Sequence, residues 1–348
     1  MSLRSLQALL APLLVAAVAC GLAAGCGASA QAPSQHKTGA PARPAATRVK
    51  DPPDFVYVTG DSLRPKVELR SPTTGRLVKV LATFGQSFTN NGLALAPDGS
   101  AVYVTLNGPA CPRTLEIERL ATASGSRKRV GCGQQQAISA NGRLLAYASG
   151  SAFKSLTIRD LASGAKHTIG LRRLLGHGMD LQVGANITWL AGGSELIAMP
   201  QGIPVATGAS AQAGKLGPAH SRGRSSLRLI VVRVGKRGEP VHARRVTVPG
   251  ISGSVLAAGS SAPGSLLIAR LEPHRTVIDQ VSLAGARSMV QRLMSLHGLF
   301  PVAFDIRGDH FFYLVGHGPT ALWLARIGRG RLIGAHRLLR NAGGPVAW

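Results

Sequence analysis

Neutral hydrogen-bonding side chains recur in short connections of the sequence, next to glycine. They are Asn90, Asn91, Gln134, Gln135, His177, His297 and Asn341. Amides and imidazoles donate and accept hydrogen bonds, so a group of them would suit an uncharged ligand such as a sugar, a peptide or a lactone. Solvated loops are rich in the same residues, so the elements that position these side chains decide between a binding site and ordinary surface.

Motifs for catalysis and cofactor binding are missing from the sequence. It has no G-x-S-x-G elbow, no Walker loop and no glycine-rich dinucleotide motif before a helix. Glu116 and Glu118 lie two residues apart on one strand face, as solvated residues do. His177 and His297 flank glycines, as histidines in turns commonly do, and Asp180 is the one acid beside them. We therefore expect no catalytic residue, no metal and no cofactor.

Short β-rich runs alternate with glycine-containing turns beyond residue 50. One unit is a turn before an apolar strand, as in PDGS before 101–105 and ANGR before 144–148. The other is an alternating strand that ends at glycine, as in 115–125 and 156–164. Six copies of each strand, of which the first apolar strand at 55–59 has no preceding turn, predict six four-stranded sheets. The C-terminal strand at 344–348 would complete the sheet begun at residue 55, which leaves no open ring edge.

The runs LAPDGSAVYV and ISANGRLLAYAS resemble the TolB-like and WD40-like (PD40) β-propeller repeat. The resemblance implies an all-β, six-bladed β-propeller of four-stranded blades over residues 51–348, closed by pairing of its N-terminal strands with the C-terminal strand. Turn glycines 193 and 264 are 71 residues apart, which predicts an insertion at about 201–226. A seventh, degenerate blade hidden in that segment is the alternative.

Cys111 and Cys132 would lie in two connections on the same face of one blade. The connections between the second and third strands, and between successive blades, emerge on that face. We therefore expect a disulfide between these cysteines in an exported protein.

The N-terminus has the features of an export signal. A basic start precedes an apolar stretch at 6–22, and small residues follow it. Leu22-Ala23-Ala24-Gly25-Cys26 resembles the lipobox of bacterial lipoproteins, which implies a signal peptide at 1–25 and lipidation of Cys26. Residues 26–50 would then be the anchor cysteine and a flexible tether. Cleavage after Ala28-Ser29-Ala30, which would give a secreted protein, and an uncleaved membrane anchor are the alternatives.

Positive charge exceeds negative charge, with 40 Lys and Arg, 15 Asp and Glu and a formal net charge of +25. Much of it falls in 201–247 and 326–340. We expect anion binding by Arg222, Arg224, Arg228, Lys236, Arg237, Arg244 and Arg245. Nucleic acid is a poor partner because an exported chain rarely meets it and no aromatic residues interleave these arginines. A solvated basic surface without a partner is the alternative.

The sequence thus predicts an exported, lipid-anchored β-propeller on the outer side of the cytoplasmic membrane. We expect a monomeric, non-catalytic binding or scaffolding module whose partner is an envelope protein or an anionic envelope polymer or lipid. A propeller hydrolase or lactonase with its site at the channel mouth is the alternative.

Overall fold

Glycine in the left-handed region shapes the turns between strands. Five turns that precede apolar strands have φ between 67° and 71°, at Gly99, Gly142, Gly193, Gly264 and Gly308. A side chain is disfavoured in this backbone conformation. The protein therefore uses glycine wherever its chain reverses before an apolar strand.

The computed structural model describes most of residues 54–348. Outside the described residues lie 1–53, 61–63, 86–87, 112–113, 151–152, 176–178, 181–185, 203–225, 252–253, 273–274, 284–287, 306–307 and 316–319. For 88–91, 179–180, 201–202, 254 and 261 the structure describes the backbone alone. The chain divides into units 1–50 and 51–348, and only the second is described.

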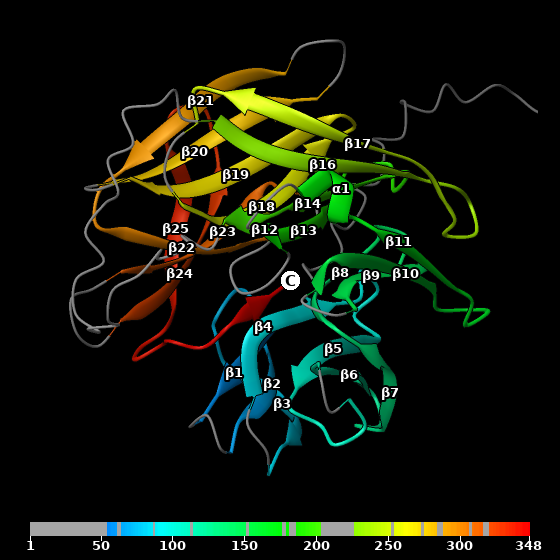
Figure 1. Cartoon of the computed structure of the whole chain (residues 1–348). Helices are drawn as coiled ribbons and strands as arrows, with labels where there is room; N and C mark the ends of the chain where they lie inside the picture. The colour runs from blue at the N-terminus through cyan, green and yellow to red at the C-terminus, as the bar shows by residue number, and fades with distance from the viewer. Residues whose placement is uncertain are drawn as a thin grey trace, which may run out of the picture. The chain divides into compact units, whose positions relative to one another are not determined.

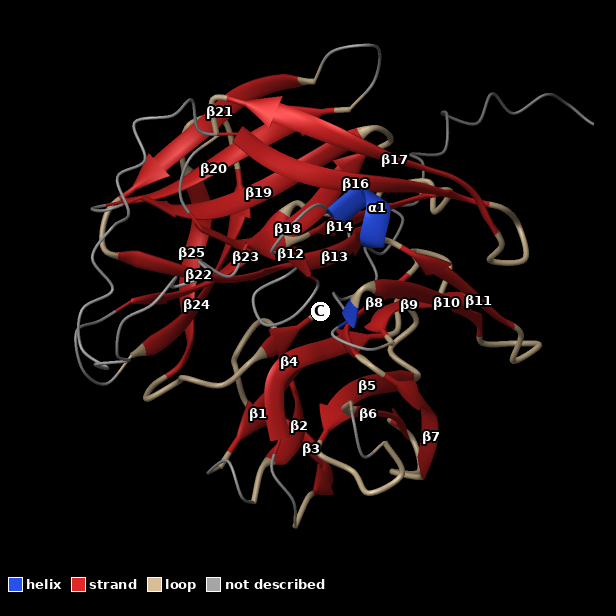
Figure 2. Ribbon diagram, viewed as in Figure 1, coloured by secondary structure: helices blue, strands red, loops and turns tan. Residues whose placement is uncertain are grey.

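Six sheets of four antiparallel strands surround a common centre (Figures 1 and 2). The innermost strands, A, are β26 (Val346–Ala347), β4 (Phe88–Leu95), β8 (Gln134–Ile138), β13 (Asn186–Trp189), β18 (Ser254–Ala262) and β22 (Leu299–Phe304). The B strands are β1 (Phe55–Thr59), β5 (Ala101–Leu106), β9 (Leu144–Ser149), β14 (Glu195–Met199), β19 (Ser265–Glu272) and β23 (His310–Val315). The C strands are β2 (Lys66–Arg70), β6 (Glu116–Ala121), β10 (Ser155–Asp160), β16 (Ser226–Val234), β20 (Arg275–Ser282) and β24 (Ala321–Ile327). The outermost strands, D, are β3 (Leu77–Thr83), β7 (Arg127–Cys132), β11 (Lys166–Gly170), β17 (Pro240–Pro249), β21 (Met289–Leu296) and β25 (Leu332–Leu339).

This arrangement confirms the predicted six-bladed propeller. Blades 1 to 6 are numbered from the blade that holds β1. Beside blade 4, β12 (Met179–Asp180) pairs with β15 (Gln201–Gly202), and α1 (Arg172–Leu175) follows β11. The predicted insertion at 201–226 falls between the neighbouring strands β14 and β16, and most of it lies outside the described residues.

The ring closes where β26 pairs with β1 in blade 1. Val56 pairs with Ala347 and Tyr57 with Val346, so the predicted pairing of the two ends is present. The Tyr57 hydroxyl accepts hydrogen bonds from the backbone N–H groups of Gly343 and Gly344, at 3.1 and 3.3 Å. Paired backbone groups thus replace an open edge on both strands.

One backbone hydrogen bond recurs in blades 2 to 6 and joins the C–D turn to the A–B turn of the same blade. The pairs, N–H donor first, are Thr122 to Ser100, Leu161 to Arg143, Val234 to Ser194, Leu283 to Gly264 and Ile327 to Asp309. Blade 1 has no A–B turn because its A strand comes from the other end of the chain. The sequence repeat therefore encodes a repeated polar contact as well as a repeated strand pattern.

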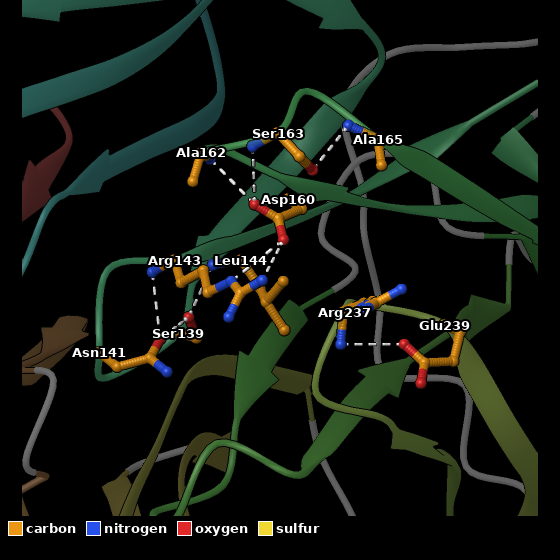
Figure 3. A network of polar contacts seen from close by, with 10 residues as sticks. All are labelled: Ser139, Asn141, Arg143, Leu144, Asp160, Ala162, Ser163, Ala165, Arg237 and Glu239. Carbon is orange, nitrogen blue, oxygen red and sulfur yellow. Dashed lines mark hydrogen bonds and ion pairs between the residues drawn. The ribbon is translucent and has the colours of Figure 1, made fainter.

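Blade 3 strengthens this turn contact with side chains (Figure 3). Arg143 donates to Asp160 Oδ2 from Nε at 3.0 Å and from Nη2 at 2.7 Å. Asp160 Oδ1 accepts the backbone N–H groups of Ala162 and Ser163. Hydrogen bonding by Arg143, then by the Ser163 amide, lowers the pKa of Asp160 from 3.8 to about 2.

Neighbouring blades contact each other where a D strand lies against the next C–D turn. Lys79 of β3 donates to the carbonyl groups of Thr122 and Ala123 in blade 2, at 3.0 and 2.6 Å. His336 of β25 lies 3.0 Å from the carbonyl oxygen of Pro72 in blade 1. These contacts supplement the apolar packing between B and C strands, where β5 and β9 are buried throughout.

The expected disulfide joins Cys111 and Cys132, with 5.7 Å between the Cα atoms. Cys111 lies in the connection between β5 and β6, and Cys132 ends β7. The bond therefore links two connections of blade 2 on the predicted face. A bridge over 21 residues contributes about 3 kcal/mol by restricting the unfolded chain.

We predict that Tyr57→Phe destabilises the protein by about 1 kcal/mol, because two backbone donors at the ring closure lose their acceptor. Urea unfolding monitored by circular dichroism would measure the loss. Tyr313→Phe is the matched control, since Tyr313 is also a buried B-strand tyrosine and burial raises its pKa. Equal losses in the two variants would contradict a role for the Tyr57 hydroxyl in closure.

Candidate functional site

The six A strands surround a central channel with a volume of about 640 Å³. Their sequences, FTNNGLAL, QQQAI, NITW, SVLAAGSSA, LFPVAF and VA, contain no Asp, Glu, Lys, Arg or His. Each sheet contributes an A strand to the lining. Apart from Asp305, which directly follows β22, the described lining of the channel is therefore made of backbone, apolar side chains and neutral polar groups.

Several polar side chains of this wall hold neighbouring blades together. Gln136 is buried, accepts a hydrogen bond from the Thr105 hydroxyl at 2.7 Å and donates to the carbonyl oxygen of Tyr103 at 3.0 Å. Asn186 Nδ2 lies 3.3 Å from the Val255 carbonyl oxygen, and Trp189 Nε1 lies 3.2 Å from that of Ala137. These groups fix the lining, so they are not the first candidates for ligand contact.

Gln135 and Thr188 differ from those structural polar residues. Both line the channel and are partly exposed, and neither side chain has a hydrogen-bond partner within the described part of the chain. Gln135 has φ of 58°, a conformation that costs a non-glycine residue about 1 kcal/mol or more. Phe300, 48% exposed, adds an aromatic face to the same lining. An amide, a hydroxyl and an aromatic ring can together bind an uncharged, hydrogen-bonding ligand.

The other predicted mouth residues lie in strands, in connections between blades or outside the described residues. Gln134 is buried in β8, and Asn90 and Asn91 lie in β4 rather than in a turn, with undescribed side chains. His297 is exposed between β21 and β22. Asn341 is exposed at φ of 55°, just before the lining residues 343–348. His177 lies outside the described residues, as does Cys26.

A charged cluster at the A–B turn of blade 6 was missed by the sequence reasoning. Asp305, Asp309 and His310 bring potential ligand atoms within 4.8 Å of one another. His310 Nδ1 lies 3.3 Å from Asp305 Oδ2 and 3.0 Å from Asp309 Oδ1. The His310 ring packs edge-on against Trp348, with centroids 5.1 Å apart. The run Gly308-Asp309-His310 could have signalled the pair, but Asp305 joins it only through the folded turn.

The proton on His310 fits this cluster better than a metal ion does. Hydrogen bonding to Asp305 raises the pKa of His310, with Asp309 acting in the same direction and burial against it. The Nδ1 atom of the ring faces the carboxylate oxygens that a cation would need. Asp305 is the one carboxylate side chain among the described residues of the channel lining.

The residues predicted to bind anions lie on blade 4 where they are described. Arg228 is on β16, Lys236 and Arg237 are in the turn that follows, and Arg244 and Arg245 are on β17. All five are exposed, and Glu239 in the same turn accepts the Arg237 amide at 2.9 Å. Arg222 and Arg224 lie outside the described residues, so the structure describes five of the seven residues predicted to bind anions.

Comparison with solved structures supports the fold. TolB from Acinetobacter baumannii has a TM-score of 0.56 and 14% identity, over 86% of this chain and 67% of TolB. The Cps50 (Swd1) β-propeller domain of Myceliophthora thermophila has a TM-score of 0.47 and 12% identity, over 85% and 90% of the two chains. A putative 6-phosphogluconolactonase from Bacteroides fragilis has a TM-score of 0.41 and 14% identity, over 85% and 97%.

No protein-family model matches the sequence, and the search of curated proteins found no match. The likeness to TolB, at 14% identity and a TM-score of 0.56, shows a shared fold alone. The resemblance to the TolB-like propeller is therefore confirmed for architecture. In the described part of the chain, no helix has the length and hydropathy needed to cross a membrane.

We predict that His310 makes stability depend on pH. Its folded-state pKa is raised above the ordinary 6.5, so its contribution is full below pH 6.5 and is lost as pH rises through the raised value. The free energy of unfolding, measured with urea, should fall more between pH 5.5 and pH 8.5 in the unaltered protein than in His310→Gln. Asp309→Asn should give an intermediate loss, and the same pH dependence in all three proteins would reject the assignment.

Proposed function

We propose that the protein is an exported, lipid-anchored binding module of the bacterial cell envelope, whose central channel receives an uncharged, hydrogen-bonding part of its partner. One observation carries the proposal: six strands without a charged residue surround a channel of about 640 Å³. An anionic ligand would lose its hydration there without gaining an ion pair, and the one described carboxylate of the lining, Asp305, already interacts with His310. Amide and hydroxyl groups of a ligand can exchange water for Gln135, Thr188 and exposed backbone.

A hydrolase or lactonase working in this channel would need acids, a metal or an activated nucleophile in the lining. Asp305 is the one carboxylate among the described lining residues, and the adjacent His310 ring interacts with it. The described lining residues therefore favour binding over turnover. An envelope protein with an exposed polar segment is the partner that suits this lining.

Site-specific crosslinking tests the channel. A photoreactive amino acid at Gln135 should capture a partner in the native envelope, because this residue faces the channel. The same amino acid at Ser124, exposed in the C–D turn of blade 2, is the control and should not capture it. Identical products from both positions would reject the channel as the binding site. Turnover of a lactone or ester that Gln135→Ala abolishes would instead favour the enzyme.

Replacement of the proposed lipidated residue tests the anchor. Cys26→Ala should move the protein from the detergent phase of fractionated cells into the medium, since one thiol carries the whole lipid attachment. Cys20→Ala is the control, because Cys20 lies in the proposed signal peptide and should leave the fractionation unchanged. Retention of Cys26→Ala in the detergent phase would contradict lipidation at this residue.

A further inference from the structure

Charge in the propeller depends on a strand's distance from the centre. The six A strands have no charged residue, whereas the six D strands contain nine Lys and Arg and no Asp or Glu. Acids on B and C strands are often paired inside their blade, as Glu68 is with Arg70 and Asp279 with Arg270. The outer rim is left basic as a result.

Basic residues on an edge strand also prevent pairing with another edge, so charge alone does not mark a binding surface. A second feature is concentrated on part of the rim. Seven of the nine large exposed apolar side chains lie on D strands. Four of these belong to blades 6 and 1: Leu77 is 49% exposed, Val78 53%, Val80 42% and Ile333 43%.

Blades 6 and 1 are in contact where the C-terminal end of β25 lies against the C–D turn of blade 1. His336 of β25 contacts the Pro72 carbonyl in the C–D turn of blade 1, at 3.0 Å. Gly75 of that turn lies so close to the Leu338 backbone that a Cβ there would come within 1.9 Å of its carbonyl oxygen. The start of β3, directly after this turn, is therefore adjacent to β25. We define the blade 6–1 rim as Arg76, Leu77, Val78, Ile333, Arg331 and Arg337.

The bases of the blade 6–1 rim are available for an external partner. Arg76, Arg331 and Arg337 are exposed, and none has an ion pair with a described residue. Two other D-strand arginines differ, since Arg127 is paired with Glu118 and Arg292 lies 3.5 Å from Glu272. Neither β3 nor β25 carries an acid.

Exposed apolar side chains interleaved with unpaired bases match the surface of a bilayer that contains anionic lipid. Arginines bind its headgroups, while leucine, valine and isoleucine enter the boundary with the acyl chains. A soluble polyanion would use the arginines and leave the apolar residues in water. We propose that the blade 6–1 rim docks the propeller on an anionic lipid bilayer.

This inference rests on the proposed function in one respect, that the exported chain meets a membrane. The strand that follows the tether, β1, belongs to blade 1, so the chain joins the propeller at the blade that also carries β3. A lipid on Cys26 would raise the local concentration of this rim at the membrane. Docking itself does not need the lipid.

Vesicle binding tests the proposal with the full chain carrying Cys26→Ser, which has no lipid. It should sediment with phosphatidylglycerol–phosphatidylcholine vesicles in low salt, far less in 0.5 M salt, and not with phosphatidylcholine alone. The rim variant Arg76→Gln/Arg331→Gln/Arg337→Gln should lower partitioning about 100-fold. The apolar variant Leu77→Ser/Val78→Ser/Ile333→Ser should lower it about 10-fold or more at unchanged charge.

The matched control is Arg233→Gln/Arg244→Gln/Arg245→Gln, which removes three exposed charges from blade 4. It should keep most of the binding. An equal loss in the control would show that net charge alone acts and would overturn the proposal. The proposal would also be overturned if the apolar variant kept its vesicle binding and the rim arginine variant lost binding to dextran sulfate, a soluble polyanion. Channel crosslinking at Gln135 involves none of these residues, so either result can fail without the other.

Discussion

Pairing between two short strands from opposite ends of the propeller is the constraint on which the architecture depends. β26 contributes only two residue pairs to β1. Around them, the Tyr57 hydroxyl satisfies two backbone donors, and Trp348 packs edge-on against Phe312, with ring centroids 5.6 Å apart. Phe312 in turn contacts Phe55, so aromatic packing supports a closure that has few backbone bonds. Without closure, β1 and β22 would each present an edge or face to water.

In the closed ring, the charged residues that a strand carries depend on its distance from the centre. The A strands are so near the centre that a charge on them would face other walls across a narrow space, and they carry none. Several buried acids on B and C strands have basic partners, as in the Arg270–Asp279 pair at 2.6 Å. The D strands face solvent and hold bases. The sequence-based prediction assigned excess charge to particular blades, but the structure divides it by distance from the centre.

Local patterns were enough to predict most of the fold. Glycine turns and alternating runs repeat within each blade, and their order predicted closure and the Cys111–Cys132 bridge. The candidate binding surface was harder to predict, because no sequence pattern shows which of three consecutive glutamines is buried and which lines the channel. A register irregularity between Gln134 and Ala137 leaves Gln134 and Gln136 buried and Gln135 in the channel. Asp305 and His310 are brought together by the fold of one turn, and Gly75 and Leu338 by a contact between blades far apart in the sequence.

The C-terminal segment has two structural roles. Residues 343–348 close the ring through β26, and they also form part of the channel wall. Occupancy of the channel and integrity of the ring are therefore thermodynamically linked. A ligand that contacts this segment binds only the closed form, and its binding free energy adds to the stability of closure. Conversely, any fluctuation that detaches β26 removes part of the channel wall, so the affinity for a ligand that contacts this segment depends on the equilibrium of the β1–β26 pairing.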